Sequence, residues 1–303
     1  MKGLKKIALC SAVALAPFAA NADLKALNDS DMSSVTGQAG VTIDLSANVT
    51  VGEIAYKDGG FLALSGVALG GSGIITGDAA ATALDDIRLT IDVVGTAGGD
   101  LGISDQATGY LGAALVNVNS TDVAVTDGDL VIALRSQSGT PVDFGLAIGE
   151  VSLNAEANAA DLGSFATGAN KGTVLVSNLG IAGAIGPIDI VVDAQSQNMN
   201  INAFFNAQGT LTMPFMNTTL GFKLHNARGA STAIVGADAN GNPVSFAHAQ
   251  VDINPSANGL GVNVTDFSGD LDLTSITFGT SPSIGSLYMT DLTITANMDV
   301  YGH

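Results

Sequence analysis

Few side chains in this sequence are arranged in a way that would support catalysis or metal binding. The three histidines, His225, His248 and His303, are far apart in the chain and have no ligand partner two or four residues away. A zinc site needs three or four ligands, with short spacings among some of them. We therefore expect each histidine to be a surface or half-buried strand residue, and we expect no metal or other cofactor.

Other catalytic patterns are also incomplete. Asp85 and Asp86 would suit the paired acids of a glycoside hydrolase, but adjacent residues of a strand point to opposite faces. The segment 238–242 has alternating Asp and Asn like a calcium loop, yet lacks the later ligands and the closing Glu, so we expect a hairpin tip. The sequence holds no Gly-x-Ser-x-Gly elbow and no phosphate-binding loop. These observations predict a protein that is not an enzyme.

The composition narrows the classes of partner. The 303 residues include 10 Lys and Arg against 28 Asp and Glu, a formal net charge of -18. Such a chain offers no cationic surface for nucleic acid, because that binding depends on neutralising phosphates. A single Cys excludes a disulfide framework. With 47% hydrophobic residues, the chain is too apolar for a disordered acidic protein.

The first 22 residues have the organisation of a secretory signal peptide. A basic start precedes the apolar segment 7–16, and Ala20-Asn21-Ala22 supplies small residues for the peptidase. We expect cleavage between Ala22 and Asp23. The apolar segment is shorter than the roughly 20 residues that a bilayer requires, so we expect no transmembrane helix. The mature protein is therefore predicted to be exported, to the cell surface or the medium, with the periplasm or outer membrane as alternatives.

Residues 23–40 predict a short capped helix. Asn28 is a suitable N-cap, and the flanking Leu27 and Met32 have the spacing of a hydrophobic staple. Gly37 is a natural C-terminal stop. An isolated helix this short is unstable in water, so its apolar side chains, including Val35, must dock on a surface.

This segment resembles a known family. The run 27–43, Leu-Asn-Asp-Ser-Asp-Met-Ser-Ser-Val-Thr-Gly-Gln-Ala-Gly-Val-Thr-Ile, is similar to the N-terminal signature of exported Gram-negative proteins called pilus assembly proteins of the Fil type. The specific match covers about residues 24–43, and the resemblance implies association with a surface or filament. The same spacing is similar to double-glycine leader peptides, although Gln38 replaces the second Gly. The segment is thus predicted to be a docked helix, or alternatively a recognition or processing element.

From Val41 onward, apolar and polar residues alternate. Both 41–51 and 292–300 keep this period-two pattern, and shorter segments between them repeat it. One apolar face per strand favours antiparallel pairing. We therefore predict an all-β domain over 41–303. We expect an elongated, mainly antiparallel β-sandwich or partly open barrel with the short N-terminal helix, and an irregular β-solenoid as the alternative.

Some local features qualify this pattern. The pairs Ser177-Asn178 and Thr290-Asp291 follow apolar strands in two similar segments, and we expect a strand bend or bulge at each. Ala79–Ala83 and Ala155–Ala169 carry the weakest strand signals and predict short helical or loop excursions. The similar segments have no fixed spacing, which argues against a regular solenoid.

The strands 41–51 and 292–300 contain no Lys, Arg or Pro, the residues that usually protect an exposed sheet edge. At an edge, either would be able to add to a strand of another subunit. The simpler expectation is that both are internal, or pair with each other and close the sheet, and this is the arrangement that we predict.

Together these features predict a non-catalytic, exported structural protein of the cell surface, associated with a pilus or filament system. Its expected partners are copies of itself or pilus-system proteins, and the sequence does not specify a ligand. An extracellular adhesion or ligand-binding module is one alternative. An outer-membrane β-barrel is another, although 5% aromatic residues without Trp do not supply the girdles of such barrels.

Overall fold

The computed structural model describes residues 40–93, 128–155, 162–167, 172–229, 234–237, 243–257 and 259–302, all within the compact unit Gly40–His303. The predicted signal peptide, cleavage site and capped helix lie outside these residues. The described part is all-β, and every strand pairing in it is antiparallel, which confirms the predicted class. The strands form one 14-stranded open sheet, so the partly open form describes it, and the solenoid alternative does not.

The strands vary widely in length. They are β1 (Val41–Ala47), β2 (Val49–Lys57), β3 (Phe61–Gly70), β4 (Leu84–Val93), β5 (Leu130–Ser136), β6 (Val142–Asn154), β7 (Thr173–Val192), β8 (Met199–Met213), β9 (Thr218–His225), β10 (Ile234–Ala237), β11 (Pro243–Pro255), β12 (Leu260–Phe278), β13 (Leu287–Thr293) and β14 (Ala296–Val300). The helical pieces are α3 (Gly73–Thr76), η2 (Ala79–Ala81) and η4 (Pro214–Met216). The piece η2 confirms the helical excursion expected at Ala79–Ala83.

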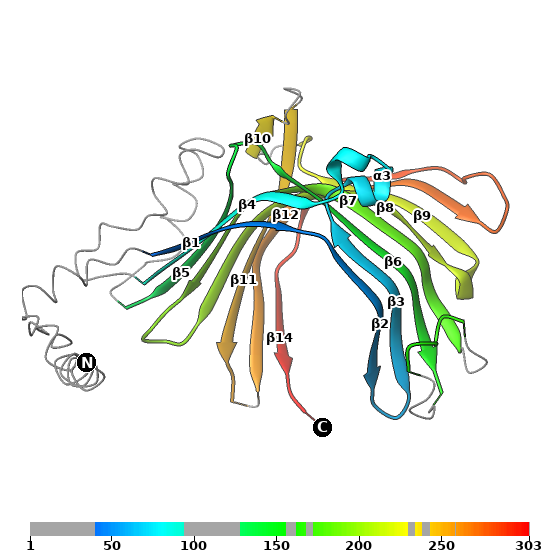
Figure 1. The fold of residues 1–303 in the computed structure, drawn as a ribbon, viewed down its shortest axis with the longest axis horizontal. Helices are drawn as coiled ribbons and strands as arrows, with labels where there is room; N and C mark the ends of the chain where they lie inside the picture. The colour runs from blue at the N-terminus through cyan, green and yellow to red at the C-terminus, as the bar shows by residue number, and fades with distance from the viewer. Residues whose placement is uncertain are drawn as a thin grey trace, which may run out of the picture. The chain divides into compact units, whose positions relative to one another are not determined.

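The chain crosses the sheet as a simple meander (Figure 1). Three long strands, β7, β8 and β12, each cross it without interruption. Five further crossings are each made of two strands in line: β1 with β2, β3 with β4, β5 with β6, β9 with β11, and β13 with β14. We call these eight crossings passes 1 to 8 in chain order, so that β7, β8 and β12 are passes 4, 5 and 7. Each of passes 2 to 7 pairs with the pass before it and the pass after it.

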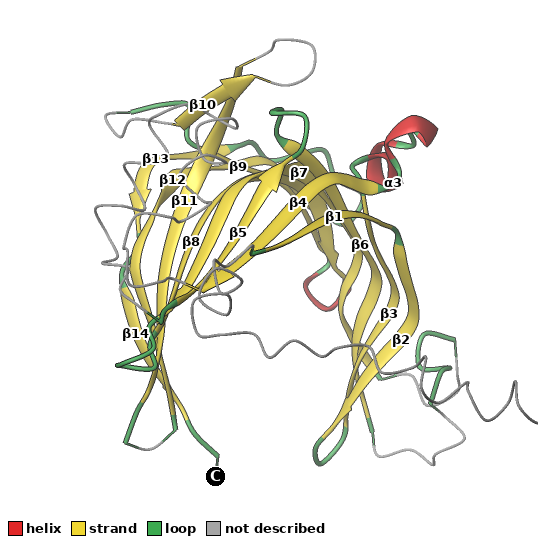
Figure 2. Cartoon of the chain, turned by 60° about the vertical axis from the view of Figure 1, so that its left-hand side comes forward, coloured by secondary structure: helices red, strands yellow, loops and turns green. Residues whose placement is uncertain are grey.

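The interruptions in passes 1, 2, 3 and 6 lie close to one line across the sheet, whereas Ile294, at the break in pass 8, is level with Ile43, five residues before the break in pass 1. Pass 1 is broken at Asn48, pass 2 by the link that carries α3 and η2, and pass 8 at residues 294–295. Pass 3 is broken by residues 137–141, between β5 and β6. Pass 6 is broken by the segment between β9 and β11, which carries β10. Figures 1 and 2 show the sheet arching over this line, with the strand ends of the two halves pointing down on opposite sides. We call the half with β1, β4, β5, β11 and β14 the first half, and the other the second half.

Local backbone features permit the bending. The pairing of β7 with β8 shifts register between Ile185 and Ile188, around Gly186-Pro187, where proline cannot donate to the ladder. Asn178 and Asp291 adopt left-handed φ values of 51° and 55°, and each lies at a register shift. Asn and Asp tolerate this conformation better than other non-glycine residues. The bulges predicted at Ser177-Asn178 and Thr290-Asp291 are therefore confirmed.

The sheet has little conventional core, because it is a single layer with short segments packed on one face. Phe61 and Phe165 lie with ring centroids 5.1 Å apart, and both are buried with Ala63. The link with α3 packs so closely on β6 that a Cβ on Gly145 would lie 2.5 Å from the carbonyl oxygen of Gly71. Glycine is therefore required there by space.

The structure corrects the predictions for the first and last strands. Residues 41–51 are interrupted at Asn48, and 292–300 are interrupted at 294–295, so neither is one continuous strand. β1 and β2 pair only with pass 2, and β13 and β14 pair only with β12. Within the described residues both passes are therefore edges, and the expectation that they are internal or close the sheet was wrong. The curvature of the sheet is too small to bring pass 1 and pass 8 together, so the sheet stays open.

Candidate interaction surfaces

The two faces of the sheet differ in chemistry, most clearly along β8. β8 shows this in one strand: its odd-numbered residues are Met199, Ile201, Ala203, Phe205, Ala207, Gly209, Leu211 and Met213. Its even-numbered residues are polar, apart from Phe204. Because successive side chains of a strand point to opposite faces, β8 presents an apolar face and a polar face.

The apolar face continues across every pass, because residues paired by register share a face. In the first half, one row is Val41, Ile91, Ile132, Ile190, Ile201, Val251, Val264 and Ala296. The next row is Ile43, Leu89, Leu134, Ile188, Ala203, Ala249, Phe267 and Ile294. In the second half, a register row is Val49, Leu69, Leu146, Ile181, Gly209, Phe222, Leu273 and Leu287. None of these rows contains a charged or polar side chain.

The apolar face is the concave one. Gly180 pairs with Thr210, an even-numbered residue of β8, so both belong to the polar face. A Cβ on Gly180 would lie 3.5 Å from Ile75 of α3, so α3 packs on the polar face. Figures 1 and 2 show α3 on the outer side of the arch. The polar face is therefore convex, and the apolar rows line the inside of the arch.

Exposure on the apolar face is greatest at the two edge passes. Val41 is 56% exposed and Ile43 is 42% exposed on pass 1, and Met298 and Val300 are 47% and 57% exposed on pass 8. The corresponding side chains of the middle passes are half-buried. Passes 1 and 8 thus expose large apolar side chains to solvent. Within the described residues, the outer backbone groups of these two passes also have no partner strand.

The geometry of pass 8 identifies backbone groups that point away from the sheet. Ile294 donates its N–H to Phe267 at 2.9 Å and accepts one from it at 3.0 Å. In an antiparallel ladder, the neighbours of such a doubly bonded residue direct their N–H and C=O the other way. The N–H of Thr293 therefore points outward from the edge.

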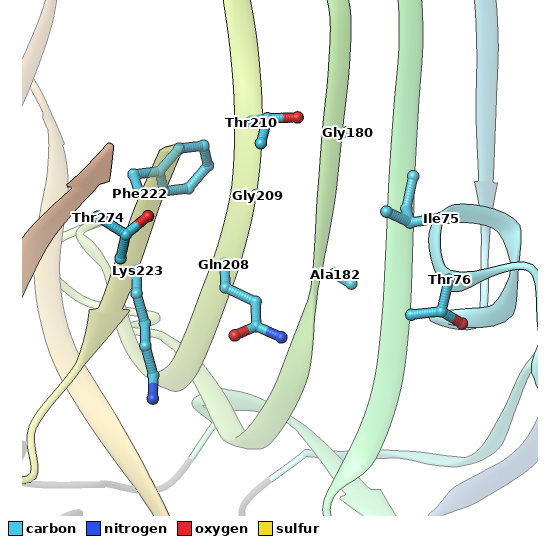
Figure 3. Close-up of a pocket in the computed structure, with 10 residues that line it drawn as sticks. All are labelled: Ile75, Thr76, Gly180, Ala182, Gln208, Gly209, Thr210, Phe222, Lys223 and Thr274. Carbon is cyan, nitrogen blue, oxygen red and sulfur yellow. The ribbon is translucent and has the colours of Figure 1, made fainter. Parts of the chain in front are cut away.

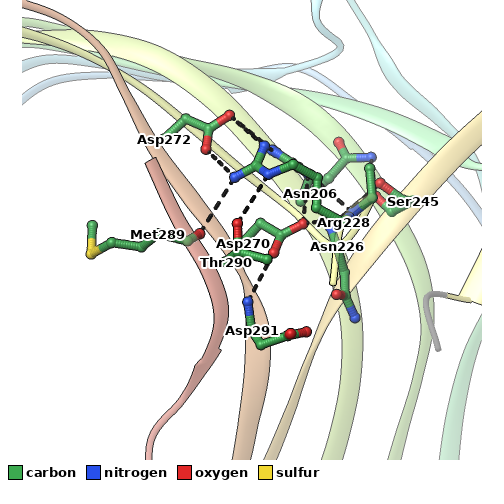
Figure 4. Close-up of polar contacts among 11 residues, drawn as sticks. Asn206, Asn226, Arg228, Ser245, Asp270, Asp272, Met289, Thr290 and Asp291 are labelled. Atoms are coloured by element: carbon green, nitrogen blue, oxygen red, sulfur yellow. Dashed lines mark hydrogen bonds and ion pairs between the residues drawn. The ribbon is translucent and has the colours of Figure 1, made fainter. Parts of the chain in front are cut away.

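A polar cluster fastens pass 8 to β12 (Figure 4). Asp270, which is fully buried, accepts the backbone N–H groups of Arg228 at 2.8 Å and Asp291 at 3.1 Å. The guanidinium of Arg228 donates to both carboxylate oxygens of Asp272, at 2.6 and 3.1 Å, and to the hydroxyl of Thr290 at 3.2 Å. The cluster thus holds the link after β9 against two strands.

His225 belongs to the same cluster. Its Nδ1 accepts the backbone N–H of Ala227 at 3.1 Å, and its Nε2 lies 3.0 Å from Asp272 Oδ2 and 3.1 Å from Arg228 Nη1. The hydrogen bond from Arg228 to Asp272 is the main reason that the pKa of this carboxyl is lowered. His225 is only 5% exposed, so the expectation of a surface or half-buried residue was wrong for it, whereas His248 is half-buried as expected. His303 lies outside the described residues.

A second buried ion pair lies in the first half. Arg135 Nη2 forms an ion pair with Asp189 Oδ1 at 2.6 Å, and the two residues are 2% and 6% exposed. Arg135 Nη1 donates to the carbonyls of Leu134 and Ile188. Burial raises the pKa of Asp189, and Arg135 only partly offsets this effect. Neither polar cluster places a nucleophile beside a base, so both are best explained as structural.

The pocket beside α3 offers little chemistry. Its volume is about 320 Å³, and it lies between α3 and the strands β7 to β9, where Ile75, Gly180, Gln208 and Thr210 line it, with Lys223 as its charged side chain (Figure 3). It contains no carboxylate or histidine to pair with that lysine. Among the described residues, no group of three His, Cys, Asp or Glu side chains is placed to hold a metal ion.

Comparison with known proteins adds one match. Residues 1–95 match a family described as a "Family of unknown function (DUF6160)". The match includes β1 to β4, and therefore the edge formed by pass 1. No curated protein and no solved structure matches the chain. Within the described residues, no helix is long and apolar enough to cross a membrane.

The residues predicted to form the N-terminal site all lie outside the described part of the chain. They are the cleavage-site residues Ala22 and Asp23 and the motif residues Leu27, Asn28, Met32, Val35, Gly37 and Gln38. The surfaces found here were only partly visible in the sequence. The alternation revealed an apolar face on each strand, but the side of the arch on which those faces meet depends on the three-dimensional curvature.

Proposed function

We propose that this protein is a non-catalytic, exported structural protein of the cell surface whose copies associate edge to edge. Pass 8 of one copy pairs with pass 1 of the next. The observation that carries this proposal is that both end passes have no neighbour on their outer side in the described residues. The resemblance of residues 24–43 to Fil-type pilus assembly proteins supports a place in a pilus or filament system.

The two edges suit one another in direction and in length. Consecutive passes are antiparallel, so the first and the last of eight passes also run in opposite directions and would extend the meander. In pass 1, β1 has 7 residues and β2 has 9. In pass 8, β13 has 7 residues and β14 has 5. If the register rows continue from copy to copy, Ala296 faces Val41 and Leu287 faces Val49, so β13 and the first residue of β14 lie along β1 and the first residue of β2.

The side chains suit the same pairing. The row that begins at Val41 ends at Ala296, and the row that begins at Val49 ends at Leu287, so pairing would continue apolar rows from copy to copy. Pairing would also cover exposed apolar side chains at both edges and satisfy outward backbone groups. Because the pairing joins two different edges, it is head-to-tail and generates either a ring or a filament.

Electrostatic repulsion works against this assembly. A formal net charge of -18 makes copies repel at low ionic strength, and salt screens that repulsion. Association should therefore strengthen as salt is raised. An assembly held by surface ion pairs would weaken under the same change.

The decisive variant is Thr293→Pro, in which proline removes an outward N–H and leaves the bonds of Ile294 to Phe267 in place. Thr293→Val is the matched control, because it keeps the N–H and nearly the same shape. We expect Thr293→Pro to be monomeric with a near-native thermal melt, and Thr293→Val to assemble like the native chain. Assembly of the proline variant at native strength would overturn the proposal.

A further inference from the structure

We propose that two neighbouring turns at the rim of the second half insert into the surface of a zwitterionic lipid bilayer. One is η4, between β8 and β9, and the other is the loop 279–286, between β12 and β13 (Figure 1). Phe215 and Met216 of η4 are 57% and 52% exposed. Ile284 of the loop is 68% exposed, and Phe278, the last residue of β12, is 47% exposed. We call these four residues the apolar tip.

Hydrogen bonds join the two turns and fix their shape. Gly279 donates its N–H to the carbonyl of Asn217 at 2.7 Å, which holds the loop beside η4. Within the loop, the N–H of Ile284 donates to the carbonyl of Ile276 at 2.8 Å, and the N–H of Ile276 donates to the hydroxyl of Ser283 at 3.1 Å. Backbone groups that already have partners cost less to bring toward hydrocarbon than unpaired ones. The turns therefore present the apolar tip outward on a bonded support.

The sequence around the tip carries no charge. Residues 194–222 contain no Lys, Arg, Asp or Glu, and neither do residues 273–290. Charged side chains are costly to bring into a bilayer, so their absence lets both turns approach its surface. The hairpin between β2 and β3, in contrast, carries Lys57 and Asp58. The net charge of -18 makes anionic lipids repel the chain, so we commit to a zwitterionic surface.

The size of the tip favours a bilayer over a protein partner. A large aromatic side chain buries about 150–250 Å², and the four side chains of the tip are each about half exposed. The tip therefore offers roughly 400 Å² of apolar surface, whereas a stable protein–protein interface needs about 800 Å² on each partner. A bilayer needs no matching surface of fixed shape, so apolar side chains that protrude from turns are enough to enter it.

Sedimentation with phosphatidylcholine vesicles tests the proposal on the full exported chain. The double variant Phe215→Ser with Ile284→Ser removes apolar surface from the tip and leaves the apolar rows of the concave face unchanged. Tyr301→Ser is the matched control, because it removes a similarly exposed side chain that follows β14 in the first half. We expect the double variant to bind at least about tenfold more weakly than the native chain, and the control to differ by less than about twofold.

The lipid and salt dependence should follow from the charge. Binding of the native chain to phosphatidylcholine should persist at high salt, because apolar contact is not screened. Adding phosphatidylglycerol to the vesicles should weaken binding at low salt, because the chain is acidic.

A fluorescent label shows whether the tip itself enters the bilayer. The sequence has a single Cys, Cys10, within the predicted signal peptide, so one new cysteine gives a unique labelling site in the predicted mature chain. An environment-sensitive dye on Ile284→Cys should shift to shorter wavelength when vesicles are added, and the same dye on Tyr301→Cys should not. Because Ile284 is exposed, this change leaves the packing of the sheet intact.

Four outcomes would overturn the proposal. The native chain does not bind the vesicles, the double variant binds like the native chain, or the dye on Ile284→Cys does not shift. Finally, Met32→Asp or Thr293→Pro binds vesicles while the native chain does not, which would mean that the predicted N-terminal helix or another copy covers the tip. Vesicle binding by a native chain that does not assemble would support the proposal and reject the edge pairing alone.

Discussion

The buried pair Arg135–Asp189 allows a quantitative test of the fold. Arg135→Met keeps most of the side-chain volume but removes the cation that lies 2.6 Å from Asp189. Asp189 is 6% exposed, so its carboxylate would be left buried without its partner. Breaking a buried pair in this way costs about 3–5 kcal/mol. We expect a loss of that size in the free energy of unfolding at pH 7.5.

The stability deficit of Arg135→Met should also depend on pH, in a direction that the pKa of Asp189 determines. Burial already raises the pKa of Asp189, and loss of Arg135 should raise it further. A group whose pKa is raised on folding contributes stability below its unfolded pKa and loses that contribution as pH rises through the folded value. The deficit of Arg135→Met should therefore shrink as the pH is lowered toward 4, where Asp189 is protonated.

Urea unfolding followed by circular dichroism at pH 7.5 and pH 4.5 measures both effects. The double variant Arg135→Met with Asp189→Leu is the control, because it removes both charges and also the buried Nε of Arg135, which has no hydrogen-bond partner in the described structure. It should recover most of the lost stability. A deficit below about 1 kcal/mol at pH 7.5, or one that does not change with pH, would refute the reasoning.

Three other predictions follow from the sequence and the polar cluster. Asp270→Ala removes the charged acceptor of two part-buried backbone N–H groups and should cost about 2–4 kcal/mol in urea unfolding, while an unchanged midpoint would contradict the assigned bonds. Because the pKa of Asp272 is lowered on folding, its stabilisation should persist above its unfolded pKa and disappear as pH falls through the folded value. An acid titration of Asp272→Asn should lack that component. N-terminal sequencing of exported protein should begin at Asp23, and a start at Met1 would reject the predicted signal peptide.

The strands were predictable from the sequence because period-two alternation is a local signal. The bulges at Asn178 and Asp291 were also predictable, since a short polar side chain after an apolar strand favours a left-handed residue. The arch was not, because it arises from interruptions in passes 1, 2, 3 and 6 that come into line only when the sheet is assembled. Strand 41–51 gave no local indication of its break at Asn48.

The candidate surfaces were harder to predict for the same reason. Whether pass 1 is an edge depends on the position of pass 8, more than 200 residues later in the chain. The burial of His225 depends on Asp270 and Asp272, which are brought to it by the pairing of β9 with β12. Sequence spacing between these residues carries no sign of the contact. The absence of complete catalytic motifs, in contrast, was a local observation.

The molar mass of the exported chain in solution is the most direct measure of edge-to-edge association. Light scattering should be recorded from low to high salt for the native protein, Thr293→Pro and Thr293→Val. We expect assemblies that grow with salt for the native chain and Thr293→Val, and a salt-independent monomer for Thr293→Pro. A native chain that remains monomeric at every salt concentration, or a proline variant that assembles with it, would show that the edges do not pair.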